Sequence, residues 1–280
     1  MTKTQSTKQI WRPYVSYNLW SEFEPAVGRE SFHCDMKRGF NRARKREPQV
    51  AELLAQQDSI PIQIGLLAQM GVYEFHRNSQ LLVQSDGVEK VAEILQLYQK
   101  PEEVRKRVHL VLQNYYQNPI LVDKEILKLS RTDEGFPEPI LMQQGSYTFN
   151  FFAAIDCIFQ EPDGTLHILD FKTGKSDIDR RQAYLYLLAV RYLYPRRSAI
   201  ASFYNLETGE RSEPIQATST VLTSFQIEIA RLAKQHQQDL KRYRYYREEF
   251  ERVFPPNPGL TCRYCPFSSI CAFSDSEVAA

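Results

Sequence analysis

The segment from Ser146 to Lys172 constrains the fold of this chain more than any other part of it. Ser146 to Gln160 is rich in aromatic and β-branched residues, which favours a strand. Glu161-Pro162-Asp163-Gly164 has the composition of a turn, and His167 to Lys172 has that of a returning strand. The segment therefore predicts a β-hairpin around which the rest of the chain is organised.

Helical patterns precede this hairpin, and a helix, a strand and a helix follow it. Residues 1–60 and 61–130 have mostly helical patterns. The later elements are expected at about 180–193 (helix), 199–205 (strand) and 218–253 (a long helix that stops at a proline-rich run). This order indicates a mixed α/β fold, a single domain over 1–280 with one central sheet flanked by helices.

Three charged residues lie on the predicted hairpin: Asp156 on the first strand, and Asp170 and Lys172 on the second. Side chains alternate along a strand, so Asp170 and Lys172 project from one face, about 7 Å apart. A two-residue turn at Asp163-Gly164 would place Asp156 opposite Phe171, on the wrong face. We therefore expect a loop of odd length, or a bulge, that brings Asp156 to the same face.

Two carboxylates beside a lysine suit metal-assisted cleavage of a phosphodiester. Carboxylate oxygens bind Mg²⁺ or Mn²⁺, which polarises a phosphate and acidifies a bound water. An ammonium offsets charge that develops on the phosphoryl oxygens. The alternative is an ordinary ion pair on a sheet. The apolar neighbours Ile168, Leu169 and Phe171 favour the metal site, because charges on a buried strand are costly without compensation.

The hairpin resembles the catalytic motif of PD-(D/E)XK nucleases, with Asp156 as the first acid and Asp170-Phe171-Lys172 as the (D/E)xK element. The segment from Gln182 to Tyr186 matches the QxxxY motif of the RecB-like branch, and its spacing puts both residues on one helical face. The resemblance implies a restriction-endonuclease-like core over 61–253. It also implies that this face borders the active site and contacts the DNA backbone.

One position departs from the family pattern. Members usually carry a histidine metal ligand in a GxxxH context, whereas Gly65 is followed here by Gln69. An amide oxygen is a weaker ligand than imidazole for Mn²⁺. His76, two helical turns further on, is an alternative ligand.

Three of the five cysteines, Cys262, Cys265 and Cys271, form a C-x2-C-x5-C pattern that suits one metal centre. Cys34 is the natural fourth ligand, because Cys157 is adjacent to Asp156 on the hairpin and should point away from it. The spacing leaves zinc, an iron–sulfur cluster and buried free thiols open.

One cysteine near the N-terminus and three near the C-terminus resemble the arrangement in iron–sulfur RecB-like nucleases. These include CRISPR-associated adaptation nucleases and AddB-type repair nucleases. The resemblance implies a [4Fe–4S] cluster held in a helical subdomain made jointly by residues 16–60 and 254–280. It also implies an exonuclease that acts on single strands or DNA ends, in recombination and repair or in CRISPR adaptation.

Charge and hydropathy add few further constraints. The chain has 35 basic and 34 acidic residues, so a DNA partner requires a local patch. Residues 37–46 and 241–247 are the two basic segments, and ordinary solvated helix faces are the alternative. No apolar run is long enough to span a membrane, and no secretory signal is apparent, so we expect a cytoplasmic protein.

A non-catalytic iron–sulfur protein that binds nucleic acid or assists assembly is the alternative function. Asp156, Asp170 and Lys172 favour the enzyme, whereas Gln69 favours the alternative. The sequence lacks a GxxxxGK[ST] motif, so a helicase activity would require a protein partner. The integration machinery of CRISPR adaptation is the other partner that the resemblance implies.

Overall fold

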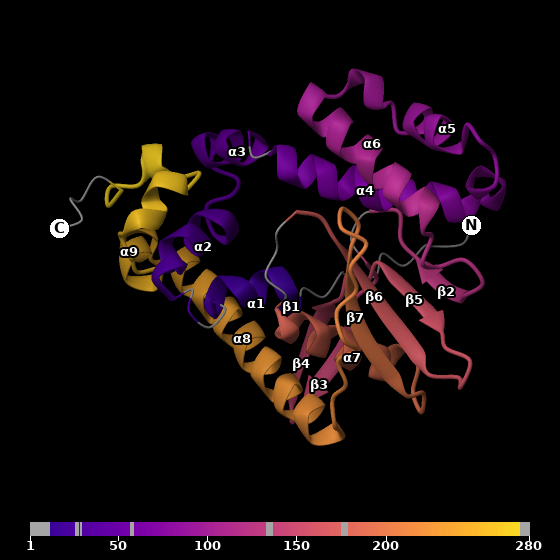
Figure 1. Ribbon diagram of the computed structural model, residues 1–280. Helices are drawn as coiled ribbons and strands as arrows, with labels where there is room; N and C mark the ends of the chain where they lie inside the picture. Colours follow the sequence, from indigo (N-terminus) through magenta and orange to yellow (C-terminus); the bar gives the residue numbers. More distant parts are fainter. Residues whose placement is uncertain are drawn as a thin grey trace, which may run out of the picture.

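The computed structural model describes residues 12–25, 28, 30–56, 59–132, 137–174 and 179–274. Two β-sheets lie side by side, with helices packed on and around them (Figure 1). The mixed α/β class is therefore confirmed. Within the described ranges, no helix is both long and apolar enough to cross a lipid bilayer.

The hairpin lies in a four-stranded mixed sheet with the order β2-β5-β6-β7. Its strands are β2 (Glu125–Leu129), β5 (Cys157–Gln160), β6 (Leu166–Lys172) and β7 (Ala199–Asn205). β5 pairs antiparallel with both β2 and β6, whereas β7 runs parallel to β6. Because β6 is central, it is paired on both sides and held rigidly.

A second, three-stranded sheet has the order β1-β4-β3. It contains β1 (Tyr14–Ser16), β3 (Ile140–Gln144) and β4 (Tyr147–Phe152). The sequence predicts one strand from Ser146 to Gln160, but residues 153–156 are not in a strand, so β4 and β5 belong to different sheets. The expected central sheet is thus accompanied by a second one.

Alternation along β5 and β6 divides the core into two layers. Leu166 and Ile168 face the layer formed with α7 (Arg180–Leu193) and α8 (Ser219–Tyr245). Leu169 and Phe171 face the layer formed with α4 (Ile60–Arg77), α5 (Gly87–Ile94) and α6 (Glu102–Gln117). Buried apolar area is the main stabilising contribution in such layers. The hairpin is therefore enclosed between α4 and α7.

A third apolar cluster joins the two ends of the chain, at the left of Figure 1. It involves α2 (Asp35–Arg42), α3 (Pro48–Ala55), α9 (Phe250–Val253) and the 3₁₀ turn Ser268–Ile270. The 3₁₀ turn Leu260–Tyr264 contacts Ser268–Ile270. We call this part the cysteine-bearing lobe. α1 (Tyr17–Phe23) and α8 lie between the lobe and the sheets.

Several elements differ from the sequence prediction. The helix at 180–193 and the strand at 199–205 are confirmed with their expected bounds. β1 and β2 were not predicted, because residues 1–60 and 61–130 have mainly helical patterns, and no strand was predicted at β3. The long helix ends at Tyr245 rather than Val253, since the chain turns back there so that Phe250 packs against Phe40 with ring centroids 5.3 Å apart.

Candidate active site

The β5–β6 turn sets the register of the two acids. Glu161 and Thr165 close the hairpin with a backbone hydrogen bond of 2.8 Å, and Gly164 in the loop between them has φ +85°. The glycine tolerates this left-handed conformation, which a side chain disfavours. Cys157 pairs with Leu169, so the next positions, Asp156 and Asp170, lie opposite each other. The expected odd-length loop is confirmed.

Asp156 lies just before β5 and accepts two hydrogen bonds. Gln69 Nε2 donates to Asp156 Oδ1 at 2.9 Å, and the Phe171 backbone N–H donates to Asp156 Oδ2 at 2.8 Å. Burial and the nearby Asp170 carboxylate raise the pKa of Asp156 to about 8, even though these donors oppose the shift. Two carboxylates in a poorly solvated site repel each other, so the site favours a cation.

Asp170 and Lys172 project from the same face of β6, as expected. Asp170 is only 4% exposed. Lys172 Nζ lies 2.7 Å from Asp170 Oδ2 as an ion pair, and Nζ donates to Gln182 Oε1 at 2.9 Å. Oδ2 has no hydrogen-bond partner among the described residues beyond this ion pair, so a cation at this oxygen would have to share it with Lys172.

Gln182 and Tyr186 on α7 hold the other oxygen of Asp170. Tyr186 Oη donates to Asp170 Oδ1 at 2.8 Å, and Gln182 Nε2 donates to it at 3.1 Å. Burial and the two nearby acids raise the pKa of the Tyr186 phenol, so it remains a proton donor. The QxxxY face borders the acids as the resemblance implies, and its polar groups orient Asp170 and Lys172.

Gln69 lies in the site, whereas His76 does not contact it. Gln69 reaches Asp156 from α4, on the opposite side of the sheet from α7. His76 Nε2 shares a 2.6 Å hydrogen bond with Tyr115 Oη, and burial lowers the pKa of His76 to about 4. His76 is therefore a neutral, half-buried residue, and Gln69 is the side chain of α4 that reaches the acids.

The donor set fits a hard divalent cation only in part. Asp156 and Asp170 supply carboxylate oxygens, and Gln69 has an amide oxygen that a flip of its side chain would present. Within the described residues, however, no three His, Cys, Asp or Glu side chains are grouped so that they could hold a metal ion. Water or a substrate phosphate would have to complete the coordination, as is usual for Mg²⁺.

Four cysteines line one cavity of about 50 Å³ in the cysteine-bearing lobe: Cys34, Cys262, Cys265 and Cys271. All are free thiols. Burial raises the pKa of Cys265 and Cys271, and the neighbouring Cys34 adds to both shifts. Cys157 is fully buried in the layer against α4–α6, away from this cavity.

Two arginines of the first basic segment, 37–46, form ion pairs that stabilise the fold. Arg38 is 2% exposed and forms ion pairs with Asp35 at 2.8 Å and Asp239 at 2.9 Å. Arg42 pairs with Glu22 at 2.7 Å. Both arginines are therefore engaged in ion pairs, unlike the basic residues of a solvated helix face.

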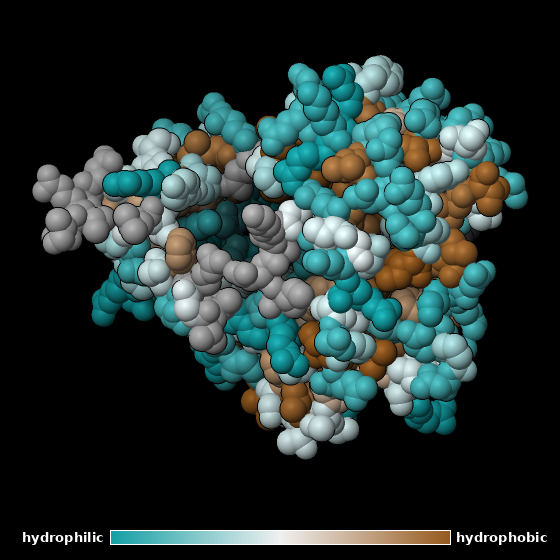
Figure 2. All heavy atoms as spheres, in the orientation of Figure 1, coloured by the Kyte–Doolittle hydropathy of each residue, from teal (hydrophilic) through white to brown (hydrophobic). Residues whose placement is uncertain are grey.

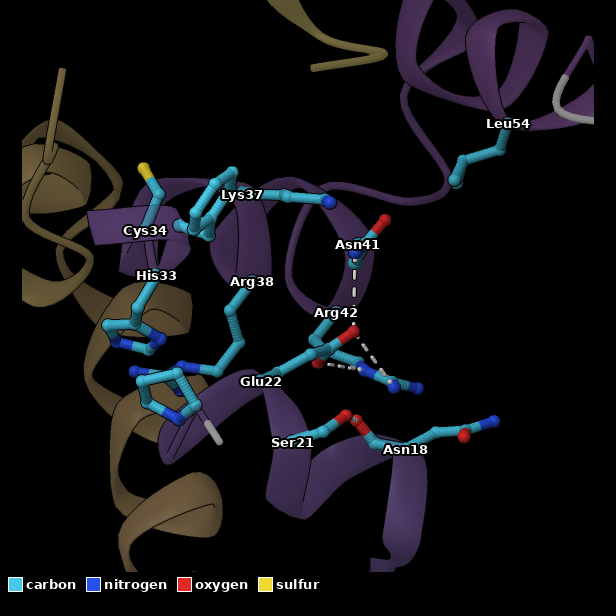
Figure 3. Close-up of a pocket in the computed structure, with 12 residues that line it drawn as sticks. Asn18, Ser21, Glu22, His33, Cys34, Lys37, Arg38, Asn41, Arg42 and Leu54 are labelled. Carbon is cyan, nitrogen blue, oxygen red and sulfur yellow. Dashed lines mark hydrogen bonds and ion pairs between the residues drawn. The ribbon is translucent and has the colours of Figure 1, made fainter. Parts of the chain in front are cut away.

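Two larger cavities lie beside the segment. One of about 740 Å³, between α1 and α2, is shown in Figure 3, and Figure 2 shows a hydrophilic hollow between the lobe and the sheets. The other, of about 540 Å³, is lined by Lys45 and by Gln182 and Tyr186 of the site. Both cavities include Asn18 and Arg42, so they are adjacent.

The second basic segment exposes two of its three tyrosines, whereas Tyr243 packs against Phe250 in the lobe. Tyr245 and Tyr246 are 68% and 54% exposed, and Arg242 is paired with Glu249. None of these residues lines the cavities described above. Contact of this segment with nucleic acid stays a prediction.

Comparison with known proteins agrees with the geometry of the hairpin. No curated protein matches the chain. The solved structure of SSO0001 is 15% identical to it, with a TM-score of 0.30 and an alignment that covers 74% of this chain and 94% of that one. The family model of the PD-(D/E)XK nuclease superfamily matches residues 50–272, which is most of the sequence. The chain therefore belongs to the PD-(D/E)XK nuclease superfamily.

Proposed function

We propose that this protein is a metal-dependent DNA nuclease whose active site contains Asp156, Asp170 and Lys172. The observation that carries the proposal is the convergence of these residues at the end of one hairpin, where Lys172 is ion-paired with one oxygen of Asp170. Asp156 and Asp170 would hold Mg²⁺ or Mn²⁺. When bound, the ion supplies polarisation of the phosphate and acidification of a water.

The other residues of the site position these groups. Lys172 holds a positive charge beside the acids, where negative charge develops on a phosphoryl oxygen during cleavage. Gln182 and Tyr186 fix Asp170 and Lys172 through hydrogen bonds of 2.7–3.1 Å. The same two side chains line the 540 Å³ cavity, which we propose as the site of the DNA backbone.

We further propose that Cys34, Cys262, Cys265 and Cys271 hold a [4Fe–4S] cluster. Their location around one cavity supports the proposal, although no three of the described thiols are grouped so that they could hold an ion without side-chain movement. The arrangement of the family's iron–sulfur members favours iron over zinc. In this proposal residues 16–60 and 254–280 form the cluster-binding subdomain. Anaerobically purified protein should be brown and contain iron, whereas stoichiometric zinc without iron would overturn the cluster.

The proposed reaction is exonucleolytic cleavage of single strands or DNA ends, in recombination and repair or in CRISPR adaptation. A helicase or the integration machinery would be the protein partner. Gln69 favours a second candidate, a non-catalytic DNA-binding protein, because its N–H group occupies Asp156 Oδ1.

Asp170→Ala tests the proposal. It removes a metal ligand, so cleavage of single- and double-stranded DNA should fall by about 1,000-fold or more in Mg²⁺ and Mn²⁺, while DNA binding is retained. Asp86→Ala is the matched control, because Asp86 is an exposed aspartate outside the hairpin that pairs with Lys90 at the surface. Equal cleavage by wild type and Asp170→Ala would refute the site. Wild type that binds DNA but cleaves none with either metal would support the binding protein.

A further inference from the structure

α1 lies across the first turn of α7 and is held there at both of its ends. At one end, Tyr17 Oη donates to Asp179 Oδ2 at 3.0 Å. At the other, Arg181 Nη1 donates to the backbone carbonyls of Glu24 and Pro25 at 2.9 and 3.1 Å. Carbonyls at a helix C-terminus lack partners within the helix, so the guanidinium satisfies groups that would otherwise need water.

Asp179 and Arg181 connect these two contacts into one unit. Asp179 is the N-cap of α7 and accepts from the Arg181 backbone N–H at 3.0 Å. The Arg181 guanidinium also donates to both carboxylate oxygens, at 2.7–3.0 Å. Burial alone would raise the pKa of Asp179, but Arg181 outweighs it and holds the pKa below its ordinary value. The carboxylate is therefore charged and accepts all of these bonds.

This unit directly precedes the residues that orient the acids. Gln182 follows Arg181 in the chain, and Tyr186 lies one helical turn later. Gln182 contacts Asp170, Lys172 and Tyr186 at once, at 3.1, 2.9 and 2.7 Å. A small rotation of the start of α7 would therefore change three contacts of the site together.

α1 is also bound to the cysteine-bearing lobe. Glu22 accepts from Arg42 Nε at 2.7 Å and from Asn41 Nδ2 at 3.2 Å, both on α2 (Figure 3). Cys34 is the N-cap residue of the same helix. α1 thus connects the lobe with the helix that orients the acids.

From these contacts we infer that Tyr17, Asp179 and Arg181 are positioning residues for cleavage. They fix α1 against the start of α7, and so set how Gln182 and Tyr186 hold Asp170 and Lys172. The inference rests on the proposed function, because it assigns these residues to the same reaction.

Two variants test the inference. Tyr17→Phe removes one hydroxyl and keeps the ring, and Arg181→Lys keeps the charge but cannot span Asp179 and two carbonyls at once. Each should lower kcat about 10-fold, because misplacement by about 1 Å at a distance costs up to 100-fold. Mn²⁺ affinity should fall with kcat, and amide hydrogen exchange in the first turn of α7 should become faster. The Kd of Arg181→Lys for single-stranded DNA should stay unchanged, because Arg181 does not line the 540 Å³ cavity.

Tyr192→Phe is the matched control. Tyr192 is on α7 too, and its hydroxyl donates to Gln226 of α8 at 2.9 Å, far along the helix from the acids. If Tyr17→Phe and Tyr192→Phe have equal kcat and Mn²⁺ affinity, the inference is wrong. It is also wrong if Tyr17→Phe weakens DNA binding alone, because Tyr17 would then act through the 540 Å³ cavity that it lines.

Failure of the proposed function gives a different result. Wild type that binds Mn²⁺ but cleaves no DNA would refute the nuclease, and the Mn²⁺ affinities of the variants would then decide whether the unit positions Asp170. Wild type that neither cleaves DNA nor binds Mn²⁺ would refute both.

Discussion

Asp156 and Asp170 each accept hydrogen bonds that a bound metal ion would have to share or displace. The donors come from three directions: Gln69 on α4, Lys172 on the hairpin, and Gln182 and Tyr186 on α7. Such donors orient a carboxylate and tune its affinity for metal. The side chains around the acids therefore help to set how tightly the acids bind a metal ion.

Gln69→His should strengthen the metal site. An imidazole is a better ligand than an amide for Mn²⁺, so affinity measured by calorimetry should rise roughly tenfold. His76→Gln is the control on the same helix and should leave the affinity unchanged, since His76 is bonded to Tyr115. An unchanged affinity in Gln69→His would mean that this position does not face the ion.

At the level of elements, the cysteine-bearing lobe depends on close approach between α2 and α9. A Cβ on Gly39 would lie 2.7 Å from Phe254 and 2.9 Å from Phe250. Both rings are almost fully buried and have little room to move. The glycine therefore permits the contact between the two ends of the chain.

Gly39→Ala should destabilise the lobe by about 1–3 kcal/mol, because the added methyl overpacks this contact. Gly65→Ala is the matched change on a second helix, where the nearest atom, Thr173 Oγ1, is 3.5 Å from the new Cβ. It should be neutral or stabilising by up to about 1 kcal/mol, because alanine favours helix. Denaturant unfolding of both variants checks this, and equal stabilities would contradict the overpacking.

Cys34→Ser should remove the proposed metal centre of the lobe. Because the variant removes one proposed ligand, its iron content should fall to near zero. A structural metal stabilises the fold that binds it, so the lobe should also lose protection from hydrogen exchange. Cys157→Ala removes the one cysteine outside the cavity and should keep its iron. Loss of iron in both variants, or in neither, would refute the ligand assignment.

The stability of the whole molecule should depend on pH through Asp156. Its pKa is about 8 in the metal-free fold and about 3.9 in an unfolded chain, so its contribution to stability is complete below about pH 4 and is lost as pH rises towards 8. The melting temperature of metal-free protein should fall across this window. Each 1 kcal/mol corresponds to about 2–4 °C in a protein of this size.

Added Mn²⁺ should reverse that loss, because binding to the folded state alone stabilises it. Asp156→Asn has no titrating group and should show a flatter profile and little response to Mn²⁺. A wild-type profile that is flat over pH 5–8 without metal would contradict the raised pKa.

The sequence by itself determined the hairpin, the helix that follows it, and the residue types of the site. The aromatic and β-branched composition of the strands, a Pro-Asp-Gly turn and the i, i+4 spacing of Gln182 and Tyr186 are local patterns, so they can be read without knowing what packs on them. The odd-length loop could also be predicted, because Asp156 and Asp170 can share a face only with such a loop or a bulge.

Only the tertiary structure decided what depends on segments far apart in the chain. The break between β4 and β5, the pairing of β2 with β5, and the ion pairing of Arg38 and Arg42 with acids all arise from packing. The same is true of the contact between Gln69 and Asp156, and of α1 held against the start of α7. A sequence pattern specifies which face of an element is apolar, but it does not specify which distant element covers that face.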